Sequence, residues 1–111
     1  MKINMKIKNL TPHAITFVGE DNSPIMVVEP SGQLARVSCK TEVTGNMMGI
    51  PTTETVYGEV EGLPEPKDGT IYIVSSLVAQ RCKDRNDVFI PNESVRDDKG
   101  RIIGCRSLGR V

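Results

Sequence analysis

The chain has 111 residues, with 14 basic and 14 acidic side chains and only 4% aromatic residues. This length suits one domain over residues 1–111 with an aliphatic core, and the balanced charge excludes a general nucleic-acid binder. Apolar stretches long enough to span a membrane are absent from the sequence, so no membrane partner is expected.

Short β-strands separated by turns are predicted for the N-terminal third. Ile3, Met5 and Ile7 alternate with polar residues, which favours a strand with one buried face over a signal peptide. After the break at Thr11 and Pro12, residues 14–18 and 25–28 predict a hairpin around the turn-forming residues 20–24.

The middle of the chain predicts further β structure with less regular spacing. Residues 34–37 and 41–43 are short strand candidates, and residues 52–60 form a longer β-branched run. Residues 45–51 are expected to be a loop, and the Gly and Pro residues of 62–69 predict a linker.

The segment 69–105 carries the strongest local signals. Residues 72–74 predict a strand, after which Ser75 or Ser76 can cap a short helix over residues 76–83. Residues 88–90 predict a strand that ends at Pro91, and residues 97–100 predict a hairpin turn with glycine where positive φ is needed.

Together these elements predict an all-β or β-dominated fold, namely a compact sandwich or partly open barrel with one short helix near 76–83. Small β domains leave strand edges that need cover, so we expect a homo-oligomer.

Several motifs resemble a family of small uncharacterised proteins of phages, prophages and bacteria. They are the opening Asn9-Leu10-Thr11-Pro12-His13, the central Tyr57-Gly58-Glu59-Val60 with Leu63-Pro64, the run Tyr72-Ile73-Val74-Ser75, and the closing Val95-Arg96-Asp97 with Gly100-Arg101-Ile102-Ile103-Gly104-Cys105. The resemblance spans almost the whole chain. It implies a free-standing, phage-associated domain and carries over no functional residue, since we know no established activity for the family.

The cysteine pattern indicates a reducing compartment. Cys39, Cys82 and Cys105 are odd in number and widely separated, so we expect free thiols, small core residues and a cytoplasmic location, in the host if the protein is phage-encoded.

The arginines are the main candidates for ligand binding. Arg36 lies in an apolar strand run, Arg81 and Arg85 flank the end of the predicted helix, and Arg96 precedes the tight hairpin. A guanidinium on a rigid element binds phosphate through two parallel hydrogen bonds. The alternative is a set of weak surface ion pairs, in which Arg81 pairs with Asp84, Arg85 with Asp87, and Arg96 with Asp97 or Asp98.

Ser75, Ser76 and His13 complete the candidate set. Helix-capping serines can donate hydrogen bonds to an anion, although a purely structural cap is the favoured interpretation. His13 follows a rigid Thr-Pro pair and could transfer protons near neutral pH, or it could simply fix the turn. One histidine and no paired cysteines argue against a metal, and no motif indicates a cofactor or a catalytic centre.

Three functions fit these observations. The first is a binding protein that sequesters a phosphate-bearing ligand, such as a nucleotide immune signal, with an anion site drawn from His13, Arg36, Ser75, Ser76, Arg81, Arg85 and Arg96. The second is a small nucleotide hydrolase or lyase that uses His13. The third is a protein-binding inhibitor or virion accessory protein that uses exposed strand edges or the acidic region 54–68.

Overall fold

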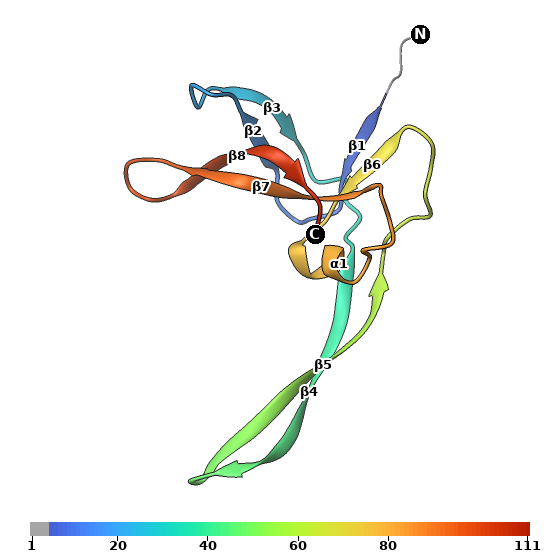
Figure 1. The fold of residues 1–111 in the computed structure, drawn as a ribbon, viewed down its shortest axis with the longest axis vertical. Helices are drawn as coiled ribbons and strands as arrows, with labels where there is room; N and C mark the ends of the chain where they lie inside the picture. Colours follow the sequence, from blue (N-terminus) through green and yellow to red (C-terminus); the bar gives the residue numbers. More distant parts are fainter. Residues whose placement is uncertain (1–4) are drawn as a thin grey trace.

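The computed structural model describes residues 5–111 and is β-dominated with one short helix (Figure 1). This confirms the predicted fold class. The elements in chain order are β1 (Lys6–Asn9), β2 (Ile15–Val18), β3 (Pro24–Val28), β4 (Arg36–Met47), β5 (Ile50–Glu61), β6 (Thr70–Ile73), α1 (Ser76–Gln80), β7 (Val88–Arg96) and β8 (Ile102–Gly109).

Six of the strands form one mixed sheet in the order β1-β6-β7-β8-β2-β3. The pairs β1–β6, β6–β7 and β2–β8 are parallel, whereas β7–β8 and β2–β3 are antiparallel hairpins. The two outer strands approach each other at the bridge between Asn9 and Pro30, where the Ser31 amide donates to the Asn9 carbonyl at 2.9 Å. The sheet therefore curls into a partly open barrel, and most of β3 is left as an open edge.

Strands β4 and β5 form a separate two-stranded sheet that leaves the body as a long arm (Figure 1). We call residues 36–61 the arm and the rest of the described chain the body. The arm gives the molecule a longest extent of 61 Å and a radius of gyration of 17.5 Å, against about 13 Å for a compact chain of this length.

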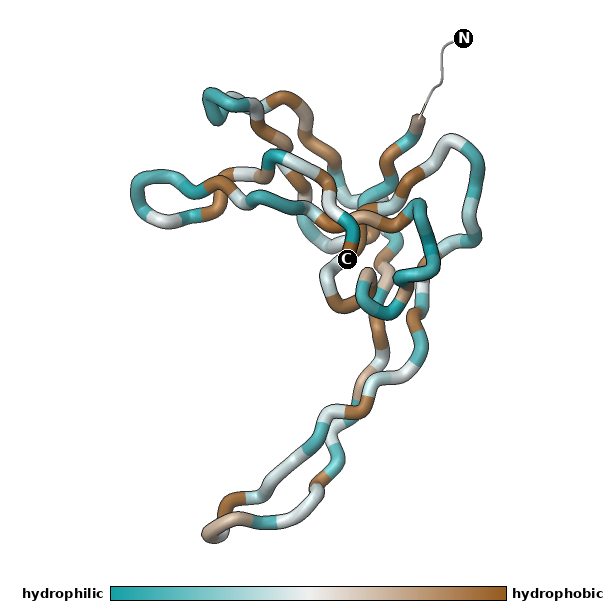
Figure 2. Tube along the Cα trace, viewed as in Figure 1, coloured by the Kyte–Doolittle hydropathy of each residue, from teal (hydrophilic) through white to brown (hydrophobic). Residues whose placement is uncertain are grey.

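The main core lies where β6, β7 and α1 meet the base of the arm, and the apolar segments converge there in Figure 2. Leu10, Tyr72, Val74 and Val78 are almost fully buried in it. Val37, Val60, Leu63 and Ile90 pack against this cluster, so the first residues of the arm are anchored in the body.

The predicted helix is present, and Ser75 is its N-cap. The Ser75 hydroxyl oxygen accepts a hydrogen bond from the Val78 amide at 3.4 Å, and Val78 and Ala79 face the core. A helix of five residues has little stability of its own, so this packing holds it in place.

The predicted loop at residues 45–51 is wrong, because the chain there continues as two strands joined by Met48 and Gly49. These two residues have φ of 55° and 84°, the left-handed pair of a tight hairpin turn. Methionine is an unusual residue at positive φ, which explains why turn chemistry did not reveal the hairpin.

Two strand predictions need smaller corrections. Strand β7 continues through Pro91 to Arg96, because β6 ends at Ile73, opposite Phe89, and Pro91 has a paired neighbour only in β8. The predicted first strand begins at Ile3, which lies outside the described residues, and the described part of that strand is β1.

The cysteine prediction holds for two of the three residues. Cys82 and Cys105 are buried, and burial raises the pKa of both thiols. Cys39 lies exposed on the arm instead, because the arm has no second layer to cover it. No helix in residues 5–111 is long and apolar enough to cross a membrane.

Candidate functional site at the base of the arm

A small hollow at the base of the arm brings two of the predicted residues together. It has a volume of about 240 Å³ and is lined by Leu10, Thr11, Pro12, Leu34, Ala35, Arg36 and Ser75. Most of this wall is apolar, whereas Arg36 and Ser75 provide a charged and a hydroxyl donor. An apolar hollow with a few polar donors is the usual composition of a small-molecule site.

The backbone around Arg36 is fixed by contacts on both sides. The Ala35 amide donates to the Leu10 carbonyl at 3.1 Å, and Arg36 pairs with Glu61 in the β4–β5 ladder. Gly62 has a φ of +84°, and a Cβ there would lie 2.0 Å from the Leu34 carbonyl oxygen. Position 62 therefore requires glycine. These contacts together hold the backbone of Arg36 in a defined position.

The Arg36 side chain is available for a ligand. Within residues 5–111 the ion pairs are Lys40–Glu42, Arg85–Asp87 and Arg101–Asp97, so none of them involves Arg36. Ser75 uses its hydroxyl oxygen as the acceptor in the helix cap, which leaves the hydroxyl proton as a donor.

Asn9 organises the wall next to this hollow. It is 1% exposed, and its amide nitrogen donates to the carbonyls of His13 and Val28 at 2.8 and 3.1 Å. Its carbonyl oxygen accepts from the Thr11 amide at 2.9 Å and from the Thr11 hydroxyl at 2.6 Å. The opening motif is therefore a buried hydrogen-bond network that shapes the turn containing Pro12.

His13 lies exposed in that turn. Its backbone carbonyl accepts a hydrogen bond from the Asn9 amide nitrogen at 2.8 Å, so the position of residue 13 is fixed through its main chain. Pro12 lines the hollow, whereas His13 is outside the set of lining residues.

Arg81 connects the helix to the arm. Its guanidinium carbon lies 5.9 Å from the centre of the Tyr57 ring, and Nη2 donates to the Gly58 carbonyl at 3.4 Å. Arg81 lines a second hollow that also contains Glu59. The carboxylate there makes this hollow less suited to an anion than the one at Arg36.

Arg85 has a structural partner, as the ion-pair alternative anticipated. Its Nε and Nη2 donate to the two carboxylate oxygens of Asp87, both at 2.9 Å, and Nη2 also donates to the Pro64 carbonyl at 3.0 Å. These hydrogen bonds hold the pKa of Asp87 below its ordinary value and raise that of Arg85. The pair fixes the linker 62–69 to the loop after α1.

Arg96 and Ser76 lie away from the hollow. Arg96 Nη1 donates to the Gly100 carbonyl at 2.6 Å in the β7–β8 turn, where Asp97 pairs with Arg101 instead. Ser76 is an exposed residue in the first turn of α1. The candidate site of the structure is therefore Arg36 and Ser75 with their apolar neighbours.

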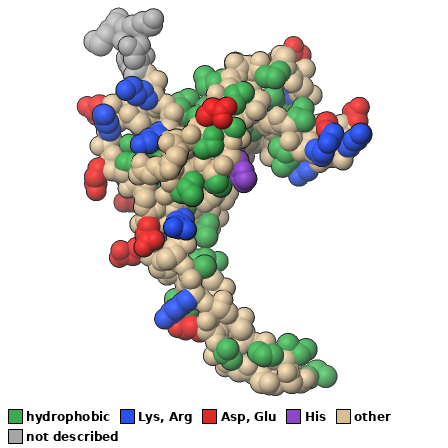
Figure 3. Space-filling view, turned by 180° about the vertical axis from the view of Figure 1, so that it is seen from behind, with side chains coloured by type: hydrophobic (Ala, Val, Ile, Leu, Met, Phe, Trp, Pro, Cys, Tyr) green, Lys and Arg blue, Asp and Glu red, His purple; other side chains and the backbone are tan. Residues whose placement is uncertain are grey.

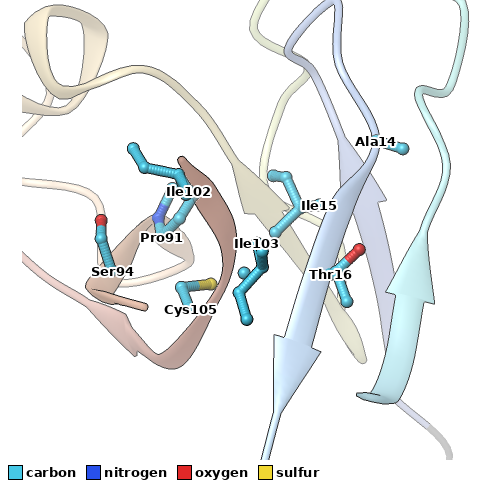
Figure 4. Close-up of a pocket in the computed structure, with 9 residues that line it drawn as sticks. Ala14, Ile15, Thr16, Pro91, Ser94, Ile102, Ile103 and Cys105 are labelled. Carbon is cyan, nitrogen blue, oxygen red and sulfur yellow. The ribbon is translucent and has the colours of Figure 1, made fainter. Parts of the chain in front are cut away.

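A larger hollow of about 360 Å³ lies between β2 and the β7–β8 hairpin (Figure 4). Every residue that lines it is uncharged: Ala14, Ile15, Thr16, Pro91, Ser94, Ile102, Ile103, Gly104 and Cys105. Sequence reasoning missed this hollow, because it lies where β2 and β8, far apart in sequence, pair as parallel strands. Residues 5–111 contain no group of His, Cys, Asp or Glu side chains that could hold a metal ion.

Comparisons with protein-family models, with curated proteins and with solved structures found no match to this chain. The resemblance to phage and prophage proteins thus stays a prediction, and function has to be argued from the geometry.

Proposed function

We propose that this protein is a binding protein that holds a small phosphate-bearing ligand, such as a nucleotide, without converting it. The observation that supports the proposal is the hollow in which Arg36 and Ser75 stand beside the apolar side chains of Leu10, Pro12 and Leu34. Arg36 would bind phosphate through its planar fork of donors, with the Ser75 hydroxyl as a further donor. The apolar wall would contact a base or another uncharged part of the ligand.

The size of the hollow limits the ligand. Its volume of about 240 Å³ is below the usual range of about 300–1,000 Å³ for ligand pockets. A nucleotide would therefore fill it and extend in part along the arm base, whereas a large cofactor would not fit. For a phage-associated protein, sequestration of a host nucleotide immune signal is a role that needs affinity and no chemistry.

The test is isothermal titration calorimetry with cyclic nucleotides and ADP-ribose derivatives as probes. We expect a probe to bind the wild-type protein at least tenfold more tightly than Arg36→Ala, with Arg36→Lys in between, because lysine keeps the charge and loses the planar fork. Lys99→Ala is the matched control, since it removes an exposed charge from the β7–β8 turn. Absence of binding for all probes, or equal affinity for wild type and Arg36→Ala, would contradict the proposal.

The same complex separates binding from catalysis. After heating, a sequestering protein releases the probe unchanged, whereas a hydrolase or lyase releases a product. If His13 is the acid or base, the His13→Ala variant should form no product. Mass spectrometry of the released molecule distinguishes the two functions.

A second candidate function is a protein-binding inhibitor or virion accessory protein, and the exposed arm favours it. Both edges of a two-stranded arm are open to pairing with another chain. A pull-down from host lysate with the whole chain, compared with a chain whose arm has been shortened, tests this function. One stoichiometric host protein captured only by the complete arm would support it, and equal capture by both chains would contradict it.

A further inference from the structure

The arm lacks partners in its own chain over most of its length. Strands β4 and β5 pair only with each other, and residues 38–51 and 53–59 are all exposed. A single two-stranded hairpin is marginally stable in water. An arm of this length is therefore expected to be covered by another molecule.

The tip of the arm is apolar. Residues 43–53 contain no charged side chain, and their most exposed large hydrophobic residues are Met48 at 96%, Val43 at 72% and Ile50 at 67%. Figure 3 shows the hydrophobic side chains gathered at the end of the arm. A contiguous apolar surface of this kind marks a protein–protein contact.

The body carries a second apolar surface that matches the tip. The uncharged hollow between β2 and the β7–β8 hairpin is about 360 Å³ in volume and is bordered by the exposed side chains of Ile102 and Ile103 (Figure 4). Flexible methionine side chains are well suited to filling such an irregular hollow.

The charges around the two surfaces are complementary. The part of the arm around the tip, residues 40–56, contains one basic and two acidic residues, a net charge of −1, whereas residues 88–111 contain five basic and three acidic residues, a net charge of +2. Contact between an arm and this hairpin would therefore be favoured, whereas two arms side by side would repel each other. Glu42 and Glu54 already face each other across one arm.

The arm cannot reach the hollow of its own chain. In Figure 1 the arm and the β2–β3 hairpin extend from the body in opposite directions, and the molecule is 61 Å long. A second copy of the chain provides both surfaces at once. We propose that the tip around Met48 and Ile50 of one copy docks in the hollow lined by Ile15, Ile102 and Ile103 of a second copy.

This contact joins two different surfaces. A reciprocal pair, in which each copy inserts its arm into the other, closes as a two-fold dimer, and a one-way contact closes only as a ring. The inference goes beyond the proposed function, because it holds whether or not the Arg36 hollow binds a nucleotide.

The test measures the mass of the full chain by light scattering and native mass spectrometry at increasing concentration. We expect an oligomer for the wild type and the mass of 12.2 kDa of a single chain for Met48→Asp/Ile50→Asp and for Ile103→Glu. Leu77→Lys is the matched control, since it adds a charge at an exposed apolar residue of α1, and it should remain oligomeric. Circular dichroism checks that each variant is folded.

A mixing experiment distinguishes this contact from others. The tip variant keeps an intact hollow and the Ile103→Glu variant keeps an intact arm, so an equimolar mixture should form a one-to-one pair that neither variant forms alone. A monomeric wild type overturns the proposal. So does an Ile103→Glu variant that still self-associates, because that result indicates arm-to-arm pairing, and so does a mixture that stays monomeric.

Discussion

The body and the arm are both built from hairpins, yet only the body buries a core. In the body, the β2–β3 and β7–β8 hairpins are joined by the parallel pairing of β2 with β8, and α1 adds Val78 and Ala79 to the core. Leu10, Ile73 and Val74 are almost inaccessible there. The arm has the same strand pairing without a second layer. The difference indicates that the free energy of folding resides mainly in the body, and that the distal arm contributes little to it.

The largest effect is expected at Asn9, where the two outer strands of the sheet approach each other. Replacing Asn9 with leucine removes four hydrogen bonds, including the two that its amide nitrogen donates to the carbonyls of His13 and Val28. We expect a loss of about 3 kcal/mol in the free energy of unfolding, measured by urea denaturation. Asn86→Leu, at an exposed loop residue, is the control and should change little. If both substitutions changed the free energy of unfolding equally, the hydrogen-bond network of Asn9 would not be a specific source of stability.

An intermediate effect is expected at the Arg85–Asp87 pair, which joins the linker 62–69 to the body. Asp87→Asn removes one charge of a pair whose side chains are each 19% exposed, so we expect a loss of about 1–2 kcal/mol at neutral pH. Asp84→Asn, at an exposed residue of the same loop, is the control.

The pH dependence of this pair has a definite sign. The pKa of Asp87 is lowered in the folded protein by its hydrogen bonds to Arg85, so its contribution is fully present above the unfolded pKa of about 4. It is lost as the pH falls through the lower folded value. Urea denaturation at pH 7 and at pH 3 should therefore show a large gap between wild type and Asp87→Asn at pH 7 and a smaller one at pH 3. A gap that is constant with pH would contradict the ion pair.

The sequence predicted those parts of the fold that depend on local chemistry. The hairpin around residues 20–24, the helix capped at Ser75, and the turn at residues 97–100 all follow from turn and cap residues, and all are present. The parallel pairs β1–β6 and β2–β8 could not be predicted, because they join segments far apart in the chain. The length of the arm was missed for a local reason, namely a turn that places Met48 at positive φ.

The candidate site was predictable only in part for the same reason. Residue type identified Arg36 and Ser75 as possible anion ligands, but tertiary contacts decide which arginines are free. Asp87 lies only two residues after Arg85, and this short spacing correctly indicated the ion pair between them. The contact of Arg81 with Tyr57 depends on the packing of α1 against the arm, which no spacing in the sequence reveals.

The smallest expected effect separates the arm from the body most directly. Thr41 and Thr55 are paired across the arm, so an Asn-Gly turn can join them and remove residues 42–54. Because the removed residues are almost all exposed, we expect the free energy of unfolding to change by less than about 1 kcal/mol. Urea denaturation at a concentration where wild type and variant are both monomeric provides the measurement.

A second closure, with Asn-Gly between Val37 and Val60, also removes Tyr57 and Gly58, which contact Arg81. The second closure should lower the free energy of unfolding by about 1 kcal/mol more than the first. The reason is that Arg81 loses both its contact with the Tyr57 ring and its hydrogen bond to the Gly58 carbonyl. If the first closure already destabilises the monomer as much as the second, the distal arm contributes to folding, and the division between body and arm fails. If only the second closure destabilises the monomer, the part of the arm that contributes to folding ends at Tyr57.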